Sequence, residues 1–230
     1  MRKLTVMALA LIVAAATFGV AGCTSSSSSG APGTDAALQP GSGSYASAAP
    51  ASEFALYGSA KYRFAMRYPK GWPSTTSGAP AGDTSGAPAT STTWADPKGK
   101  QVDGQYLDAL QVSVYELTKP ATAADVKKHA ADFKAIAWSL IRSLPGFAVT
   151  DPLKPITLNG SKGFQVTYTC TLQGTPAGAM SYLIPKGRYA YWLTGQASRE
   201  TWSSAWAKLT PAMASFTVKP LSSGATASSD

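Results

Sequence analysis

The cysteine and histidine side chains of this sequence, which could act as nucleophile or base, are Cys23, His129 and Cys170. A Ser-His-Asp or Cys-His site would have to use His129 as its base, because the chain has one histidine. The sequence contains no Gly-x-Ser-x-Gly turn to hold a serine nucleophile. A lone histidine on a predicted helix is more often an incidental boundary residue. We therefore expect no catalytic residue, and an enzyme that uses His129 is the weakest of our functional hypotheses.

Metal, phosphate and nucleic-acid binding lack their usual sequence signatures. The chain has no Cys or His spacing typical of zinc, no loop of alternating Asp and Asn, and no glycine-rich phosphate loop. Its formal net charge is +8, but the basic residues form no clustered run. We expect no metal, no cofactor and no nucleic-acid partner. The positive charge suits anionic lipid head groups or envelope polymers, and it is also an ordinary surface property.

Cys23 follows a sequence that is typical of exported, lipid-modified proteins. A short basic segment precedes an apolar run over residues 4–20, which is the order of a secretory signal. Residues 20–23 read Val-Ala-Gly-Cys and resemble the lipobox of bacterial lipoproteins. This resemblance implies cleavage between Gly22 and Cys23, a covalent diacylglycerol on the Cys23 sulfur, and in some members an N-acyl lipid. An ordinary signal peptide with an incidental cysteine, or an uncleaved membrane helix, is the alternative.

Cys170 has a different environment in the sequence. It belongs to a run in which every second residue between Phe164 and Leu172 is apolar, which predicts the buried face of a strand. A free cysteine in such a position behaves as a small hydrophobe. If Cys23 carries lipid, no disulfide within the chain is possible, and the fold depends on its apolar core.

Composition divides the chain into a leader, a tether, a domain and a tail. The Ser-, Gly-, Ala- and Pro-rich tether cannot bury enough apolar surface to fold, and its length spans ~30 Å as a random coil. A second low-complexity segment, which contains a tandem Thr-Ser-Gly-Ala-Pro-Ala, is expected to be an inserted surface loop. The predicted segments are a signal peptide (1–22), lipidated Cys23 with a disordered tether (23–52), one folded domain (53–219) with the low-complexity loop (73–92), and a disordered tail (220–230).

Within the domain, periodicity predicts an antiparallel sheet of six or seven strands and two helices, which is an α+β fold. The first helix starts at a capping box formed by Thr122 and Asp125, runs through His129, and stops at Pro145-Gly146. The second is capped by Ser198 and ends or bends at Pro211. The predicted strands and turns are a strand over 62–68, a hairpin at Asn159-Gly160, a second hairpin at residues 185–188, and an edge strand over 216–218.

The strand that ends in Tyr-Pro-Lys-Gly-Trp (68–72), the mid-chain helix, the paired hairpins and the tryptophan-bearing helix before Ser-Phe-Thr-Val (215–218) resemble the PsbP-like fold. The chain is most similar to actinobacterial lipoproteins of the LpqN/LpqT type over residues 54–218. The resemblance implies an α/β/α sandwich with a central antiparallel sheet of about six strands and two main helices. It also implies a binding or assembly module without a catalytic signature.

Three functional hypotheses follow. The first is a lipoprotein anchored at the outer face of the cell membrane, whose domain is a non-enzymatic binding or assembly module for an envelope protein. The second is a carrier or sensor of a small amphipathic ligand bound between helix and sheet, and the third is the enzyme that uses His129. Trp138, beside the apolar stripe of its helix, is a candidate partner contact, although partial burial at a helix–sheet border is the simpler interpretation.

Overall fold

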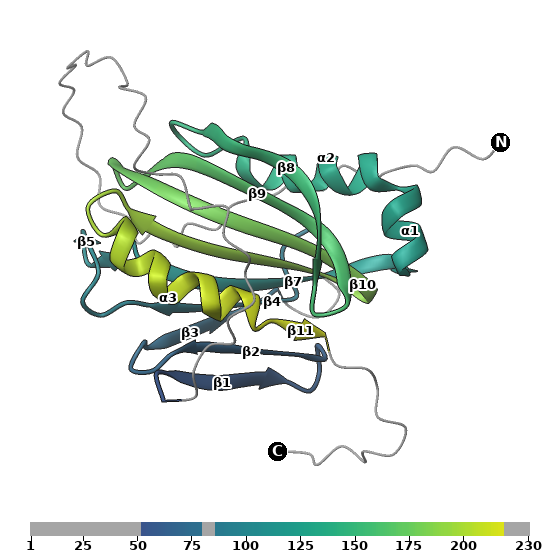
Figure 1. The fold of residues 1–230 in the computed structure, drawn as a ribbon, viewed down its shortest axis with the longest axis horizontal. Coiled ribbons are helices and arrows are strands. Elements are labelled where there is room, and N and C mark those ends of the chain that lie inside the picture. The colour runs from purple at the N-terminus through teal and green to yellow at the C-terminus, as the bar shows by residue number, and fades with distance from the viewer. Residues whose placement is uncertain (1–51, 80–85, 219–230) are drawn as a thin grey trace.

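The structure of the protein is a computed structural model that describes residues 52–79 and 86–218 (Figure 1). The predicted signal peptide, Gly22, Cys23, all but the last residue of the predicted tether, and the predicted tail lie outside the described residues. Within the described residues, no helix is long and apolar enough to cross a membrane.

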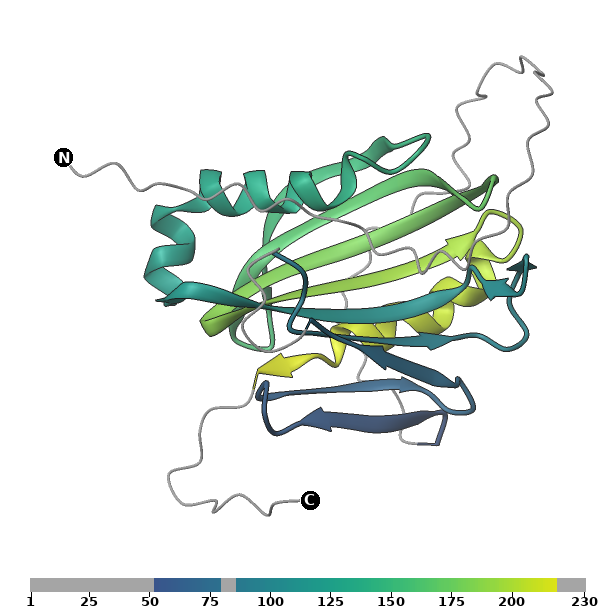
Figure 2. The same ribbon diagram turned by 180° about the vertical axis from the view of Figure 1, so that it is seen from behind.

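The main sheet is antiparallel and has the strand order β3-β4-β7-β10-β9-β8 (Figures 1 and 2). Its strands are rich in Thr and Tyr, residues that favour a pleated and partly buried surface. Its strands are β3 (Ser74–Ser77), β4 (Thr90–Ala95), β7 (Ala109–Ala121), β8 (Ala148–Leu158), β9 (Ser161–Leu172) and β10 (Thr175–Ser198).

The long strand β10 doubles back on itself. The Oγ of Ser181 lies 2.9 Å from Oγ1 of Thr194, thirteen residues further along. A straight strand would place these residues ~43 Å apart. The chain turns at Gly187, which has a φ of 61°, so that one limb of β10 pairs with β9 and the other with β7. The hairpin predicted at residues 185–188 is therefore confirmed.

A smaller sheet with the order β1-β2-β11 lies below the main sheet in Figure 1, and a short hairpin, β5 with β6, extends from the end of β4. Three helices complete the described part of the chain. The bounds of these elements are β1 (Phe54–Ser59), β2 (Phe64–Pro69), β5 (Gln101–Val102), β6 (Gln105–Tyr106), β11 (Thr217–Val218), α1 (Ala123–Lys128), α2 (Ala130–Ile141) and α3 (Trp202–Ala214).

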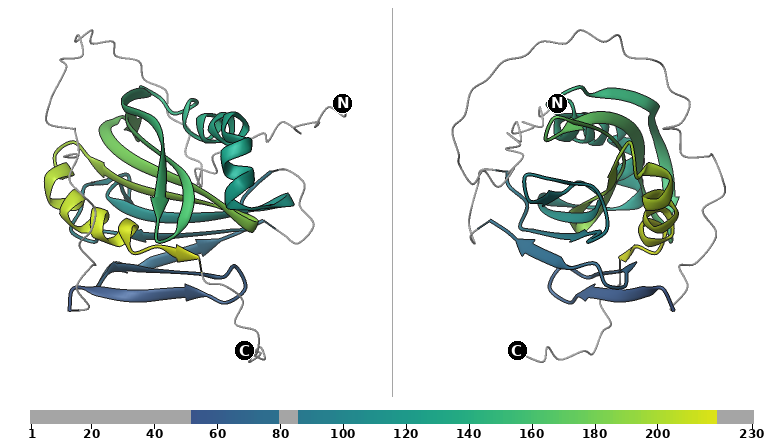
Figure 3. Two further views of the ribbon diagram at one scale, coloured as in Figure 1. Left: turned by 45° about the vertical axis from the view of Figure 1, so that its right-hand side comes forward. Right: turned by 90° about the vertical axis from the view of Figure 1, so that its left-hand side faces the viewer.

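Helices cover both faces of the main sheet (Figure 3). On one face, α3 and the small sheet enclose a core that includes the buried aromatic residues Phe64, Trp94, Tyr191 and Phe216. On the other face, α2 packs over a second core formed by Ala137, Leu140, Ile141, Val166, Tyr168 and Cys170. The predicted α+β sandwich with a central antiparallel sheet is confirmed.

The predicted first helix is two helices. Its capping box is confirmed, because Thr122 Oγ1 accepts from the N–H of Asp125 and the Asp125 carboxylate accepts from the N–H of Thr122. The helix breaks at His129, whose φ and ψ are −107° and 31°, and its second part ends at Ile141 rather than at Pro145-Gly146. The break redirects the chain, so that α1 contacts β7 and β9 while α2 covers the second core (Figure 3).

Two other helix boundaries differ from the prediction. The N-cap of α3 is Thr201 rather than Ser198, and the Ser198 hydroxyl instead lies 2.8 Å from the Thr201 hydroxyl. The helix also does not end at Pro211 but continues to Ala214. Proline costs a helix one backbone hydrogen bond, but the buried residues of this last turn, Ala212 and Met213, hold it against the sheets.

Two strand predictions also need correction. β2 begins at Phe64 rather than at Tyr62, because Arg63 has a left-handed backbone with a φ of 58°. The loop predicted over residues 73–92 contains fewer residues than expected, because Ser74–Ser77 and Thr90–Ala95 pair as β3 and β4. Hydroxyl side chains favour this pairing, as the 3.1 Å contact between the Thr76 and Thr92 hydroxyls shows.

The Asn159-Gly160 turn is confirmed and has a further role. Both residues have positive φ angles, 45° and 75°, as a two-residue hairpin requires. The Asn159 side-chain amide donates to the carbonyls of Ala214 and Phe216, at 2.8 and 2.9 Å. One side chain thus connects the β8–β9 hairpin to the carboxyl end of α3.

Replacement of Asn159 by glycine tests this connection. Glycine adopts positive φ freely, so Asn159→Gly removes the two hydrogen bonds and leaves the turn intact. We expect the free energy of unfolding to fall by about 1–3 kcal/mol in urea denaturation.

The matched control is Gln173→Gly at the equivalent position of the β9–β10 turn. Gln173 also has a positive φ, 48°, but its side chain bonds only to the exposed Gln105. This control should change the stability little, and equal losses in the two variants would contradict the proposed connection.

Candidate functional site

A pocket of about 400 Å³ lies between the α1–α2 pair and the strands β8 and β9. Three of its lining side chains are lysines, and most of the others are apolar. The lining residues are Val126, Lys127, Ala130, Lys134, Pro155, Ile156, Thr157, Lys162, Gly163 and Phe164.

Helical spacing and strand pairing explain why these residues meet. Ala130 and Lys134 lie four residues apart on one side of α2, and the break at His129 lets Lys127 of α1 line the same pocket. Lys162 and Phe164 lie two residues apart on β9, and therefore share the face of the sheet that carries the second core. The registers Lys162–Thr157 and Phe164–Pro155 bring β8 to the same place.

The pocket is positively charged. In the described part of the chain, lysines form ion pairs at Lys100, Lys154 and Lys208, and not at the three lysines of the pocket. The carboxylates nearest in sequence are engaged elsewhere. That of Asp125 accepts hydrogen bonds from Thr122, and that of Asp132 lies 3.4 Å from Nδ1 of His129. The lining therefore combines three lysines with apolar residues such as Val126 and Phe164, and it contains no carboxylate.

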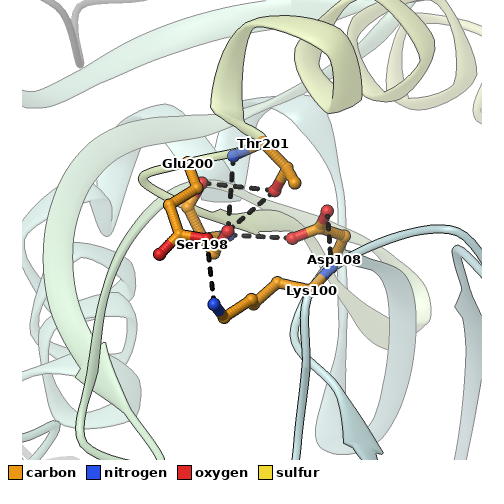
Figure 4. A network of polar contacts seen from close by, with 5 residues as sticks. All are labelled: Lys100, Asp108, Ser198, Glu200 and Thr201. Atoms are coloured by element: carbon orange, nitrogen blue, oxygen red, sulfur yellow. Dashed lines mark hydrogen bonds and ion pairs between the residues drawn. The ribbon is translucent and has the colours of Figure 1, made fainter.

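A second cluster of polar groups lies where β10 meets α3 (Figure 4). Its centre is Asp108, whose side chain is buried with 1% of the residue exposed. One carboxylate oxygen accepts from the backbone N–H of Ser198 at 2.9 Å, and the other from that of Lys100 at 3.4 Å. The Lys100 ammonium pairs with Glu200 at 2.9 Å. Asp108 accepts from backbone N–H groups, and Ser198 is fully buried. The cluster therefore connects the segment around Lys100 to the start of α3.

Two members of this cluster are expected to contribute very different amounts to stability. Asp108→Ala would leave two backbone N–H groups without their acceptor, so we expect a loss of about 2–4 kcal/mol. Glu200→Ala removes an exposed ion pair and should cost less than about 1 kcal/mol. Chemical denaturation of both variants checks the difference, and an Asp108→Ala protein as stable as the original would contradict the structural role of this carboxylate.

The structure places the predicted site residues apart. His129 is the junction of α1 and α2, and its imidazole faces Asp132. Trp138 is half-buried on α2, with its ring 6.2 Å from that of Phe147 and the Arg142 guanidinium 5.0 Å above it. The described residues contain no group of three His, Cys, Asp or Glu side chains that could hold a metal. Trp138 as a partner contact stays a prediction, as do the roles of Gly22 and Cys23.

Sequence reasoning missed the lysine pocket. Its three ammonium groups come from α1, α2 and β9, so no short segment of the sequence contains them. The i, i+7 spacing of Lys127 and Lys134 was the one signal within a single predicted helix. Lys162 follows the predicted Asn159-Gly160 turn, but only the fold shows that this hairpin packs beside the helices.

Cys170 is buried as predicted, with 4% of the residue exposed. Burial raises the pKa of the Cys170 thiol to about 11, because the apolar core disfavours the thiolate. The thiolate is the reactive form of cysteine, so the folded protein should protect this residue from alkylation.

A labelling experiment tests this protection. In the full chain carrying Cys23→Ser, where Cys170 is the remaining thiol, we expect slow reaction with iodoacetamide at pH 8 and complete reaction in urea. The native rate should rise as the pH approaches 11, where the thiolate forms. Mass spectrometry measures the extent, and rapid labelling of the folded protein at pH 8 would show that Cys170 is accessible.

Comparison with known proteins supports the fold alone. No protein-family model and no curated protein matches the sequence. The cyanobacterial PsbP protein of Synechocystis sp. has a TM-score of 0.50 and 11% identity, over 78% of this chain and 96% of that one. The described domain is therefore an α+β domain with a PsbP-like fold.

Two further solved structures have lower TM-scores. LpqN of Mycobacterium tuberculosis, described as involved in cell envelope biogenesis, has a TM-score of 0.38 and 16% identity, over 65% of this chain and 86% of LpqN. A Bacteroides thetaiotaomicron protein has a TM-score of 0.46 and 9% identity over 74% of this chain. The match spans half of that protein's length.

Proposed function

We propose that this chain is an exported lipoprotein of the LpqN/LpqT type, held at the outer face of the cell membrane by lipid on Cys23. Its PsbP-like domain is a non-enzymatic binding or assembly module. The observation that carries the proposal is the Val-Ala-Gly-Cys sequence at residues 20–23, directly after a basic segment and an apolar run. Two or more acyl chains would anchor the protein stably, where a single chain would not.

The geometry of the domain supports binding rather than bond cleavage. The pocket is lined by lysines, a threonine, a glycine and apolar residues, without a cysteine, histidine or carboxylate. The buried carboxylate of Asp108 is occupied by backbone N–H groups. His129 pairs with Asp132 at a helix junction, away from the buried Cys170 thiol, which packs in the second core. Asp108 and His129 thus interact with groups of the protein itself, as structural residues do.

The partners that this function implies are the membrane, through the lipid anchor, and an envelope protein. Trp138 on α2 and Arg142 at its C-cap form a cation–π pair, with Trp138 half-buried and Arg142 exposed. Tryptophan and arginine are enriched among the residues that dominate protein interfaces. This pair is our candidate contact for the protein partner.

Lipid anchoring is tested by Cys23→Ser. The serine hydroxyl cannot form the thioether, so we expect the variant to leave the membrane fraction or to accumulate as uncleaved precursor. Immunoblots of membrane and soluble fractions, with the intact mass of the product, measure both outcomes. Cys170→Ala is the matched control and should be processed and membrane-bound. A Cys23→Ser protein that is processed normally and stays on the membrane would refute lipidation.

One observation favours a second function, the carrier or sensor of a small amphipathic ligand. Ligand pockets are typically larger than ~300 Å³. The pocket between α1–α2 and β8–β9 has about 400 Å³ and lies between helix and sheet, where this hypothesis requires it. Its lining combines apolar residues with positive charge, which suits a ligand that has both characters.

A further inference from the structure

We propose that the pocket between α1–α2 and β8–β9 binds an anionic amphiphile, whose phosphate-bearing head group lies among Lys127, Lys134 and Lys162 while its first methylene groups contact Val126 and Phe164. This inference rests on the carrier function proposed above, and it assigns the chemical class of the ligand. The five residues come from α1, α2 and β9, which the fold brings to one cavity.

The charge of the ligand follows from the three lysines. They line one pocket of about 400 Å³, and none of the lining residues carries a negative charge. The neighbouring acidic groups Asp125 and Asp132 have other partners, Thr122 and His129. The positive charge of the lining attracts an anion, which can form charge-assisted hydrogen bonds with the ammonium groups. A cationic ligand would be repelled, and a neutral ligand would gain nothing from these charges.

A phosphate head group suits this arrangement better than a planar carboxylate. Lysine ammonium groups bind phosphate as flexible point charges, whereas arginine provides the planar fork that matches carboxylates. All three basic residues of the pocket are lysines, and they approach from a helix end, a helix face and a strand. Three donors from different directions can each reach a different oxygen of a tetrahedral group.

The apolar part of the ligand follows from the remaining lining. Val126 and Phe164 are buried behind the pocket wall, with 4% and 3% exposed, whereas Ala130, Pro155 and Ile156 line it and keep accessible apolar surface. Free phosphate would leave that accessible surface in contact with water, while a short alkyl segment would cover it and gain from its burial. The cavity holds a head group and a few methylene groups rather than a polymer such as nucleic acid.

Isothermal titration calorimetry with hexyl phosphate tests the proposal. The full chain is purified in nanodiscs of neutral phosphatidylcholine, and inorganic phosphate and hexanol are titrated separately. Hexyl phosphate should bind at least about tenfold more tightly than either half of the molecule alone, because it uses both the lysines and the apolar surface. Its affinity should fall with added salt.

A matched pair of variants locates the binding site. Lys127→Gln/Lys134→Gln/Lys162→Gln should weaken hexyl phosphate binding at least about tenfold. The control, Lys70→Gln/Lys98→Gln/Lys119→Gln, removes the same charge from lysines outside the pocket and should bind as the original does. Equal unfolding midpoints would show that both variants are folded.

The outcomes separate the parts of the argument. Equal binding by both triple variants, or no binding by the original, overturns the site. Equal affinity for hexanol and hexyl phosphate keeps a carrier function but overturns the anionic class, and equal affinity for inorganic phosphate overturns the amphiphile. Membrane fractionation of the pocket variant tests anchoring separately, since the lipid would be attached at Cys23.

The source of the amphiphile is tested by repeating the titration in nanodiscs that contain phosphatidylglycerol. A weaker apparent affinity for hexyl phosphate supports the pocket as a site for the head group of a bilayer lipid, which then competes. An unchanged affinity supports a freely diffusing amphiphile of the same chemistry.

Discussion

The main sheet is apolar on both faces, and this constraint determines the rest of the structure. On β10, Leu193 faces one core and its neighbour Trp192 faces the other. An antiparallel sheet exposed on one side would alternate apolar and polar residues instead. Both faces therefore need a cover, which α3 and the small sheet provide on one side and α1–α2 on the other (Figure 3). The lysine pocket lies on this second side, between α1–α2 and the strands β8 and β9.

Local signals in the sequence predicted the parts of the fold that local chemistry controls. The Thr122 capping box and the Asn159-Gly160 turn each satisfy their backbone within a few residues, so both were predictable. The break at His129 was not predictable, because it depends on how the two helices pack on strands that are distant in the sequence. The pairing of Ser74–Ser77 with β4 likewise depends on a partner strand rather than on its own composition. The pocket combines residues of four elements, α1, α2, β8 and β9, and only the folded chain reveals it.

Two polar side chains hold α3 through the backbone. Asp108 accepts from the N–H groups of Ser198 and Lys100, and the Asn159 amide donates to two carbonyls near the end of α3. These contacts connect segments far apart in the sequence and hold the start and the end of the same helix. The polar side chains that could contact a ligand lie instead at the border of the second core. They are the lysines of the pocket, whose long apolar stems end in a charged group.

The edges of the main sheet have a consequence for crowding. At one edge, β8 contains Pro152 and Pro155, which have no N–H to offer another strand. At the other edge, β3 is four exposed residues long. Chains confined to the plane of a membrane collide far more often than chains in solution, and a long open edge would let neighbours join their sheets. The interrupted edge and the short edge oppose such polymerisation, a property that the proposed anchoring at a membrane would require.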